Sequence, residues 1–321
     1  MTVPLLVAAC ALVACGDNRH PYVEPAWGLG VHRFDAVALG LAASHADPDP
    51  VVDALVDRPR LAVPTYDGTG QLVHPDMLRE PDRLVMAMTP YPYSNGRHEN
   101  PSLVVSSDGV TFESWGSNPI VPEPPIDHND DPDLRIDPRT GEYELLYLET
   151  LRPDTQTLVA LRSSDLLAWT RHDAIVYDLD AGDAFIVSPA AIEDAGTTHL
   201  FYVHLGATTA QLETLTSTDG RSWDRTAAVP VQIDTGAVSP WHVDVIRGDG
   251  AFAMLISGYD TVFEHQNLYL ATSPDLVTWT FRAEPLLDYT DPSLDVVSLY
   301  RSTGLVAGGT LAVWYSMQYD D

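Results

Sequence analysis

The segment from residue 128 to 138, HNDDPDLRIDP, places four aspartates and one histidine among eleven residues. Two interpretations fit this composition. Asp and Pro are common turn residues, because Asp hydrogen-bonds to nearby backbone and Pro fixes φ. Clustered carboxylates also serve acid–base chemistry, and each raises the pKa of its neighbours. A repeat of the segment along the chain would favour the acid–base interpretation over the turn interpretation.

Similar positions recur along the chain, each at the start of an apolar run. The segments are HPDML, DPDLRI, SPAAI, HVDVI and SLDVV, and their third residues are Asp76, Asp133, Ala190, Asp244 and Asp295. These residues are separated by 57, 57, 54 and 51 positions. Such regularity favours a repeated structural unit that carries a carboxylate at a fixed place.

A second repeat indicates which elements carry these carboxylates. Four segments, SSDGVTFESW, SSDLLAWTRH, STDGRSWDRT and TSPDLVTWTF, each follow an apolar run, and their tryptophans are 54, 54 and 56 residues apart. Ser-x-Asp-Gly favours a hairpin turn, with Gly supplying a positive φ. Further pairs of apolar runs lie between these segments, so each period holds four short strands. No helical pattern of useful length appears after residue 60.

Five such periods predict an all-β fold, a five-bladed β-propeller with four antiparallel strands in each blade. The fifth period stops at WYSMQYDD and lacks its outer strands. We expect N-terminal residues such as VHRFDAVAL to supply them. The propeller domain is predicted to span residues 31–321, after a linker of residues 16–30.

The first fifteen residues, MTVPLLVAACALVAC, are apolar and typical of a secretion signal, too short to span a membrane as a stable helix. Their end, LVAC, resembles the lipobox of bacterial lipoproteins, and an ordinary signal peptide cleaved nearby is the alternative. The lipobox implies a signal peptide in residues 1–15, lipidation of Cys15, and an extracytoplasmic protein anchored to a bacterial membrane by this lipid only. Cys10, the other cysteine, lies in the same segment, so the remaining domain has no disulfide.

The composition excludes several classes of function. The formal net charge is −29, whereas proteins that bind nucleic acids or anionic lipid surfaces need a positively charged binding surface. All 17 basic residues are arginine, which excludes Schiff-base chemistry and a phosphate-binding lysine. We expect a monomer that binds a neutral or cationic ligand, although most of the acidity fits a general role in solubility.

The inner strands of a propeller line its central channel and start at one end of it. We therefore expect Asp76, Asp133, Asp244 and Asp295 to ring a funnel, although Asp244 and Asp295 fit a role as caps of strand starts equally well.

The loop TPYPYSNGRHENPS returns to the same end of the channel and is long for a hairpin. Trp241 fits either a sugar-stacking or a core role. The other candidate ligands of a substrate are His74, Tyr91, Asn95, His98, Glu99, Asn100, Asp131, Ser188 and His242.

These motifs resemble the five-bladed propeller glycoside hydrolases, the group that includes glycoside hydrolase family 43 and the invertase-type fructosidases. The resemblance implies that Asp76 is a general base or nucleophile and that Asp133 orients the substrate and modulates pKa. It also implies a general-acid glutamate in blade three, where this chain reads DAFIVSPAAI and has none. Glu99 is then the first choice for the acid, because it shares the funnel face. The other choices are Asp183, Asp244 and Glu264.

The sequence thus predicts a glycosidase that acts on a neutral poly- or oligosaccharide, of arabinan or xylan type, in the axial funnel. The alternative is a non-catalytic carbohydrate-binding propeller lipoprotein, which the missing glutamate favours. Glycoside hydrolysis by two carboxyl groups requires no cofactor. Oxygen ligands and a histidine-lined axis would also suit a Ca²⁺ ion.

Overall fold

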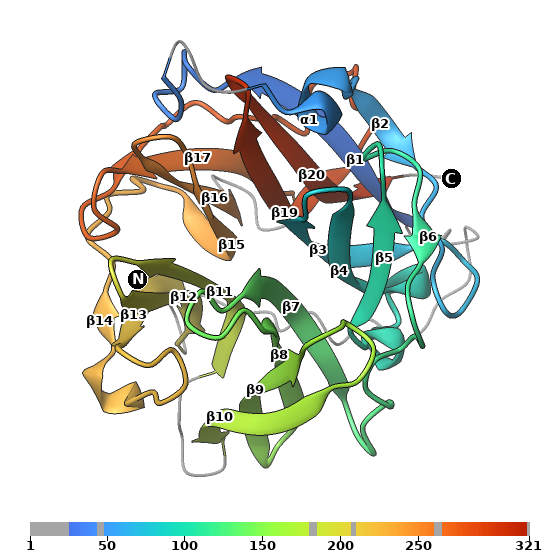
Figure 1. The fold of residues 1–321 in the computed structure, drawn as a ribbon, viewed down its shortest axis with the longest axis vertical. Helices are drawn as coiled ribbons and strands as arrows, with labels where there is room; N and C mark the ends of the chain where they lie inside the picture. The colour runs from blue at the N-terminus through green and yellow to red at the C-terminus, as the bar shows by residue number, and fades with distance from the viewer. Residues whose placement is uncertain (1–25, 44–47, 180–184, 207–209, 260–264, 320–321) are drawn as a thin grey trace, which may run out of the picture.

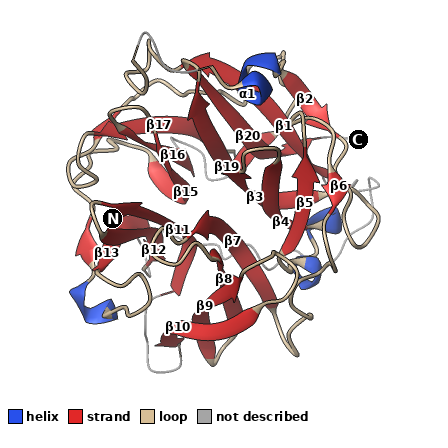
Figure 2. Cartoon of the chain, in the orientation of Figure 1, coloured by secondary structure: helices blue, strands red, loops and turns tan. Residues whose placement is uncertain are grey.

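The computed structural model describes residues 26–43, 48–179, 185–206, 210–259 and 265–319. These residues form five four-stranded antiparallel sheets arranged around a central axis, which confirms the predicted five-bladed propeller (Figure 1, Figure 2). The predicted signal peptide and Cys15 lie outside the described residues. No helix in the described part of the chain is long and apolar enough to cross a membrane.

Each blade is one sheet, and its first strand faces the axis (Figure 1). Blade I comprises β3 (Leu72–Arg79), β4 (Leu84–Pro90), β5 (Ser102–Ser106) and β6 (Glu113–Ser114). Blade II comprises β7 (His128–Ile136), β8 (Tyr143–Leu151), β9 (Thr155–Ser163) and β10 (Thr170–Asp178). Blade III comprises β11 (Phe185–Asp194), β12 (Thr197–Leu205), β13 (Ala210–Ser217) and β14 (Val229–Pro230).

Blade IV comprises β15 (Ser239–Arg247), β16 (Phe252–Tyr259), β17 (Asn267–Ser273) and β18 (Thr280–Phe281). Blade V comprises β19 (Ser298–Ala307), β20 (Thr310–Tyr319), β1 (Ala26–Asp35) and β2 (Arg58–Leu61). The helices are short: α1 (Pro50–Ala54) and the 3-10 turns η1 (Pro92–Ser94), η2 (Gly96–His98) and η3 (Arg225–Ala227).

Both ends of the chain build blade V, as its incomplete fifth period predicts. Strand β1 pairs with β20 from Ala26, opposite Tyr319, to Asp35, opposite Thr310. Residues 26–30 therefore belong to the propeller, and the prediction that the linker extends to residue 30 was wrong. These five residues are buried against β20, and burial of apolar side chains favours a strand over a solvated linker. The pairing closes the ring without a covalent bond.

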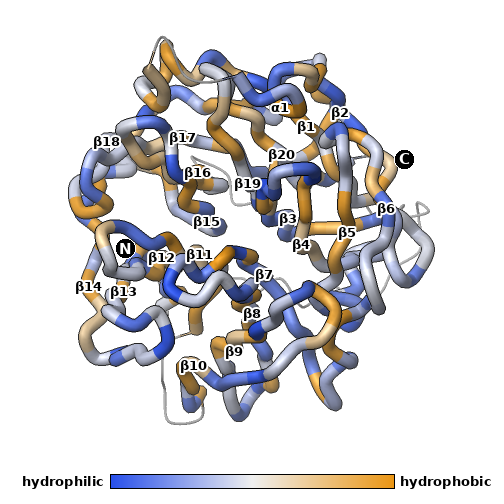
Figure 3. Tube along the Cα trace, in the orientation of Figure 1, coloured by the Kyte–Doolittle hydropathy of each residue, from blue (hydrophilic) through white to orange (hydrophobic). Residues whose placement is uncertain are grey.

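The hydrophobic core lies between the blades rather than on the axis. Buried apolar side chains of the described residues form five clusters, and each cluster joins two adjacent blades. Trp314 of blade V, for example, is fully buried against blade I, where its indole N–H donates to the carbonyl of Gly109 at 2.9 Å. Hydrophobic residues accordingly follow the strands in Figure 3, while many connecting loops are hydrophilic. The axis is left to polar side chains.

The repeated Ser-x-Asp segments form the turns between the third and fourth strands. In blade II, Ser163 Oγ accepts a hydrogen bond from the backbone N–H of Leu166 at 2.9 Å, and Asp165 Oδ1 accepts from Leu167 and Ala168 at 2.9 and 3.0 Å. The same bonds recur at Ser106 and Asp108 and at Ser217 and Asp219, and the aspartate bonds recur at Asp275. The predicted hairpin role of this motif is confirmed.

Substitution of the serine in one of these turns tests its contribution to stability. Ser163→Ala leaves the buried N–H of Leu166 without its acceptor, which is expected to lower the free energy of unfolding by about 1–2 kcal/mol. Ser164→Ala, at the exposed adjacent position, is the matched control and is expected to change it by less than about 0.5 kcal/mol. Urea denaturation measures both, and equal effects of the two substitutions would contradict the assignment.

Candidate active site

Each inner strand is irregular close to its start. The pairing register of β3 with β4 shifts between Val73 and Asp76. The register shifts at the matching place in blades II and III and begins to shift one residue earlier in blades IV and V. In blades I to III the bulge contains a proline, which has no N–H to donate to the ladder. The preceding residues adopt a left-handed backbone, with φ of 54°, 52° and 57° at His74, Asp131 and Ser188. The bulge reorients these side chains, because an extra residue twists the strand locally.

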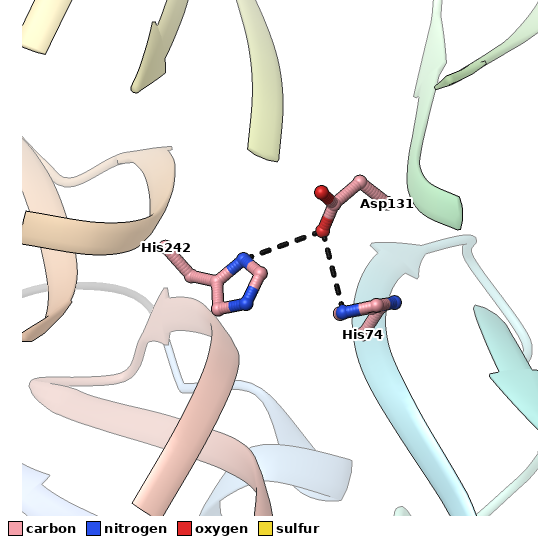
Figure 4. A group of neighbouring side chains, drawn as sticks. All are labelled: His74, Asp131 and His242. Carbon is pink, nitrogen blue, oxygen red and sulfur yellow. Dashed lines mark ion pairs between the residues drawn. The ribbon is translucent and has the colours of Figure 1, made fainter. Parts of the chain in front are cut away.

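One residue from each blade meets at this level of the channel in a cluster that we term the upper ring. Its members are all at most 3% exposed: His74, Asp131, Ser188, His242 and Arg301. Asp131 is the hub of the ring. Its Oδ1 lies 3.3 Å from Nδ1 of His242 and 3.5 Å from Nε2 of His74 (Figure 4). The same oxygen lies 3.0 Å from Nη1 of Arg301. Its Oδ2 accepts the backbone N–H of Ser188 at 2.8 Å.

The charge states of the upper ring follow from burial and from these neighbours. Burial alone would raise the pKa of Asp131, but His74, His242 and Arg301 hold it well below its usual range, so the carboxylate is ionised. Burial lowers the pKa of His74 well below its usual value, against the attraction of Asp131, so this imidazole is neutral. Neutral imidazole and ionised carboxylate are the forms that bind metal ions.

Three side chains of the upper ring could hold a metal ion. One ligand atom each from His74, Asp131 and His242 lies within 4.8 Å of the other two. Nε2 of His74 and both ring nitrogens of His242 are buried and make no hydrogen bond, although buried polar atoms normally have a partner. A set of two imidazoles and one carboxylate that leaves positions open is typical of catalytic metal sites. The residues present therefore fit a divalent cation.

A second set of side chains, the lower ring, lies two residues further along each inner strand. It consists of Asp76, Asp133, Ala190, Asp244 and Thr303, all buried. Several of them hydrogen-bond to the inner strand of the next blade: Asp76 accepts from the N–H of Leu134, and Asp133 from that of Ala191 at 3.2 Å. Burial raises the pKa of the Asp76 carboxyl well above its usual value, with further contributions from Asp133 and Asp244. These carboxylates thus connect blades below the upper ring.

Glu99 lies at the rim of the upper ring, where the sequence placed it. It follows η2, is 6% exposed, and its Oε2 lies 3.7 Å from Nδ1 of His74. Burial raises the pKa of its carboxyl well above the usual value; the nearby His128 opposes this rise, and Asp130 and Asp131 add to it. A buried carboxyl group with a raised pKa is suited to accept and return a proton near neutral pH.

Beside Glu99 lies a charged cluster of His128, Asp127 and Asp130, which the sequence motifs did not predict. The ring of His128 is held between two carboxylates, with Nδ1 2.7 Å from Asp127 Oδ1 and Nε2 3.1 Å from Asp130 Oδ2. Arg152 in turn pairs with Asp127. Burial alone would lower the pKa of His128, but Asp130, Asp127 and Glu99 raise it to about 11. His128 is therefore an imidazolium at neutral pH.

Four predicted substrate ligands in the blade I loop contact residues other than those of the upper ring. Asn100 is buried and its side-chain amide is hydrogen-bonded at both ends. Its Nδ2 donates to Tyr66 and to the carbonyl of Arg97, and its Oδ1 accepts from Asn129. Asn95 is exposed and caps η2. His98 packs near Tyr66, with ring centroids 6.4 Å apart, and Tyr91 contacts Trp27 at 5.2 Å. The structure therefore assigns Asn95 and Asn100 to loop architecture.

Two aromatic side chains adjoin the upper ring. The ring of Tyr300 packs against both imidazoles, with centroids 4.3 Å from His242 and 5.5 Å from His74. Trp241 is partly buried, its Nε1 donates to Tyr300 Oη at 3.4 Å, and its ring lies edge-on to His242. Burial raises the pKa of the Tyr300 phenol well above its usual value, so this group is neutral. Trp241 thus lies next to the upper ring, as the sequence analysis proposed.

Asp295 does not lie in the funnel, and this part of the sequence prediction was wrong. Its side chain is 88% exposed on the loop before β19 and pairs with Arg60 at 3.5 Å. The fifth blade instead contributes Arg301 and Thr303, 59 residues after the corresponding members of blade IV. The fifth inner strand is the one that runs up to the Gly308–Gly309 turn rather than the SLDVV segment, so its residues supply the fifth members. Asp183 and Glu264 lie outside the described residues.

No protein-family model matches this chain. A curated relative, the A type blood N-acetyl-alpha-D-galactosamine deacetylase of Flavonifractor plautii, is 30% identical over 317 residues. The alignment covers 78% of this chain and 40% of the relative, so the chain spans about two fifths of the relative's length.

Solved structures with a similar fold include an N-acetylgalactosamine deacetylase from F. plautii in complex with blood group B trisaccharide. It has a TM-score of 0.65 and 22% identity and covers 82% of this chain and 80% of its own. A thermostable family-43 glycoside hydrolase has a TM-score of 0.56, 14% identity and coverages of 78% and 90%. A family-43 endo-arabinanase from Bacillus licheniformis has a TM-score of 0.51, 14% identity and coverages of 72% and 84%. The predicted resemblance to these propellers is confirmed at the level of the fold.

The charge of His128 makes a prediction about stability and pH. Because its folded-state pKa, about 11, exceeds the usual value of 6.5, its contribution is complete below pH 6.5 and is lost as pH rises toward 11. The difference in free energy of unfolding between wild type and His128→Gln is therefore expected to shrink steadily from pH 6 to pH 9.5. Urea denaturation across this range measures it.

The exposed His172→Gln variant is the control, and its difference from wild type is expected to change little over the same range. A difference for His128→Gln that grows as pH rises would contradict the assigned charge state.

Proposed function

We propose that this protein hydrolyses the N-acetyl group of an amino sugar in a glycan, with a divalent cation held by His74, Asp131 and His242. The observation that carries the proposal is this buried set of two imidazoles and one ionised carboxylate, with Glu99 beside it. The deacetylase name of the curated relative supports the reaction class, since the alignment covers most of this chain. The proposal narrows the predicted function from carbohydrate chemistry in general to cleavage of an amide.

A divalent cation in the upper ring would supply Lewis-acid polarisation of the amide carbonyl and would lower the pKa of a nearby water. The chain contributes the positions of its three ligands. Arg301 hydrogen-bonds to Asp131 Oδ1, and the backbone of Ser188 holds Asp131 Oδ2, so both oxygens of this carboxylate are oriented before a cation binds. Hydrogen bonds of this kind to a ligating side chain fix its orientation in metal sites.

Glu99 is suited to the proton transfers of the reaction. It would take a proton from the attacking water as the water oxygen bonds to the carbonyl carbon. It would then give this proton to the nitrogen as the C–N bond breaks, which leaves the free amine on the sugar and releases acetic acid, which ionises to acetate in solution. Its buried position beside His74 and its raised pKa support this double role.

Tyr300 and Trp241 are suited to hold the substrate. The phenol of Tyr300 is neutral and its ring packs against both imidazoles, so its O–H can donate to the oxygen of the amide as negative charge develops there. Trp241, at the side of His242, offers an aromatic face and is partly exposed. Aromatic faces of this kind commonly pack against apolar parts of ligands.

Glycoside hydrolysis by Asp76 and Asp133 is the second candidate. The fold of the family-43 structures favours it, and so does the proximity of the two carboxylates, which offer oxygens within 4.8 Å of each other. Two observations weigh against it. Asp76 lies below the upper ring and is bonded to the backbone of Leu134, and blade III offers Ser188 and Ala190 where a general acid is needed.

The proposal also includes the location and state of the protein. We infer an extracytoplasmic monomer anchored to a membrane by a lipid, and this part of the proposal rests only on the lipobox and the acidic composition.

The reaction is tested by measuring free acetate, with reducing-sugar release in parallel. The substrates are oligosaccharides with N-acetylgalactosamine or N-acetylglucosamine residues, together with arabinan and xylan. We expect acetate without new reducing ends, and loss of activity after chelation. Asp131→Asn and Glu99→Gln are each expected to lower kcat/KM by on the order of 100-fold or more.

Asp295→Asn is the matched control, because Asp295 is an exposed carboxylate outside the channel, and its activity should equal that of the wild type. Reducing-sugar release that Asp76→Asn abolishes would instead establish a glycosidase. Glycan binding with neither product would support the non-catalytic carbohydrate-binding propeller.

A further inference from the structure

Aromatic side chains lie at the channel mouth on the side of blades IV, V and I, and the proposed reaction uses only two of them. In blades IV and V the residue directly before the upper-ring residue is aromatic: Trp241 precedes His242, and Tyr300 precedes Arg301. Three further rings continue from these two into neighbouring elements. We term this set the aromatic row: Tyr259, Trp241, Tyr300, Trp27 and Tyr91.

Successive members of the aromatic row contact one another across three blades. The ring centroids of Tyr259 and Trp241 are 6.1 Å apart, and Trp241 Nε1 donates to Tyr300 Oη at 3.4 Å. The ring centroid of Trp27 lies 5.2 Å from that of Tyr300 and 5.2 Å from that of Tyr91. The row therefore runs from blade IV through blade V to the loop of blade I.

The aromatic row is not part of the hydrophobic core. None of its members belongs to the five apolar clusters that the described residues form between adjacent blades. Tyr259, Trp241, Tyr300 and Tyr91 are partly exposed, and only Trp27 is buried. Aromatic side chains stabilise a fold by being buried in its core, whereas contiguous rings left at the surface are typical of binding sites.

Tyr93 lies at the blade I end of the row on a strained backbone. It is 52% exposed, and both it and Ser94 have a left-handed conformation, with φ of 49° and 61°. Residues other than glycine keep this conformation only where other contacts fix it. Gln71 Oε1 accepts the N–H groups of Tyr93 at 3.0 Å and Trp27 at 3.2 Å. The indole N–H of Trp27 also donates to Ser94 Oγ at 2.9 Å, so a member of the row fixes the loop that presents Tyr93 to solvent.

The chemistry of the row fits neutral sugar residues. Flat rings pack against the C–H faces of a pyranose, and tyrosine hydroxyls can hydrogen-bond to its hydroxyl groups. The centroid separations of 5.2 and 6.1 Å are comparable with the length of one sugar residue. No member carries a charge at neutral pH, so the row offers nothing to attract an ionised group. The charged cluster of His128 lies elsewhere, beside Glu99.

We propose that the aromatic row binds the neutral sugar residues that neighbour the reacting amino sugar, and that Tyr93 contacts the most distant of them. The inference rests on the proposed function, because it takes the upper ring as the position of the N-acetyl group. It names the substrate class: an oligosaccharide or polysaccharide that contains an N-acetylated residue, in preference to a free N-acetylhexosamine.

Binding and turnover are measured separately, so that this inference and the proposed reaction can fail independently. The probes are N-acetylgalactosamine, N-acetylglucosamine, and galacto-oligosaccharides from di- to tetrasaccharide that end in either residue. Calorimetry on the Glu99→Gln variant measures binding without turnover, and acetate release by the wild type gives kcat/KM. We expect affinity and kcat/KM to rise by about tenfold or more from the monosaccharides to the tetrasaccharides.

The combined results distinguish the two proposals. Acetate release with equal affinity and kcat/KM at every length would overturn the aromatic row and leave the reaction intact. Binding that strengthens with length, without acetate release, would support the row and overturn the reaction. Absence of binding for every probe would overturn both.

Variants of Tyr93 test the far end of the row. Tyr93→Ala is expected to lower the affinity for the tetrasaccharides by about fivefold to tenfold and to leave that for the monosaccharides unchanged. Tyr93→Phe keeps the ring and is expected to retain most of the affinity. Leu167→Ala, which shortens a 58% exposed side chain in a turn of blade II, is the matched control and should bind as the parent protein does. No loss in Tyr93→Ala, or an equal loss for monosaccharides and tetrasaccharides, would overturn the assignment of Tyr93.

Discussion

The carboxylate of Asp131 connects all five blades of the propeller. It belongs to blade II, and its two oxygens contact His74 of blade I, the backbone of Ser188 in blade III, His242 of blade IV and Arg301 of blade V. The side chain is fully buried. An ionised carboxylate in such a place is tolerated only where hydrogen bonds and opposite charge replace the lost water. The arrangement of the axis depends on this one group being satisfied from every side.

The location of the core explains why the axis can be polar. The apolar side chains lie in five clusters between adjacent blades, and these supply the hydrophobic stabilisation. The inner strands then need only approach one another closely enough for side chains to bridge from one blade to the next. Asp76 and Asp133 do so through backbone N–H groups, and Ser188 does so through Val243. Polar contacts on the axis therefore set blade spacing, and the same contacts orient the candidate ligands.

Two rings separated by two residues along each strand have different chemistry. The upper ring combines imidazoles, a carboxylate and a guanidinium at the end where the blade I loop brings in Glu99. The lower ring consists of carboxylates and small side chains. In blades I to III the bulge accounts for the separation, because His74, Asp131 and Ser188 fall between paired positions of the ladder while the lower-ring residues return to it. A bulge near the start of each inner strand thus contributes to two distinct levels of side chains on a single axis.

The sequence by itself determined the number of blades, the hairpin turns, the closure of blade V by the N-terminal strand and the convergence of six inner-strand residues. It could do so because these features follow from local periodicity and turn chemistry, which repeat about every 54 to 57 residues. Only the tertiary structure decided that Arg301, rather than Asp295, completes the ring. It alone separated Asp131 from Asp133 into two levels. Both depend on the register of paired strands, which a bulge shifts by one residue and which no single strand records in its own sequence.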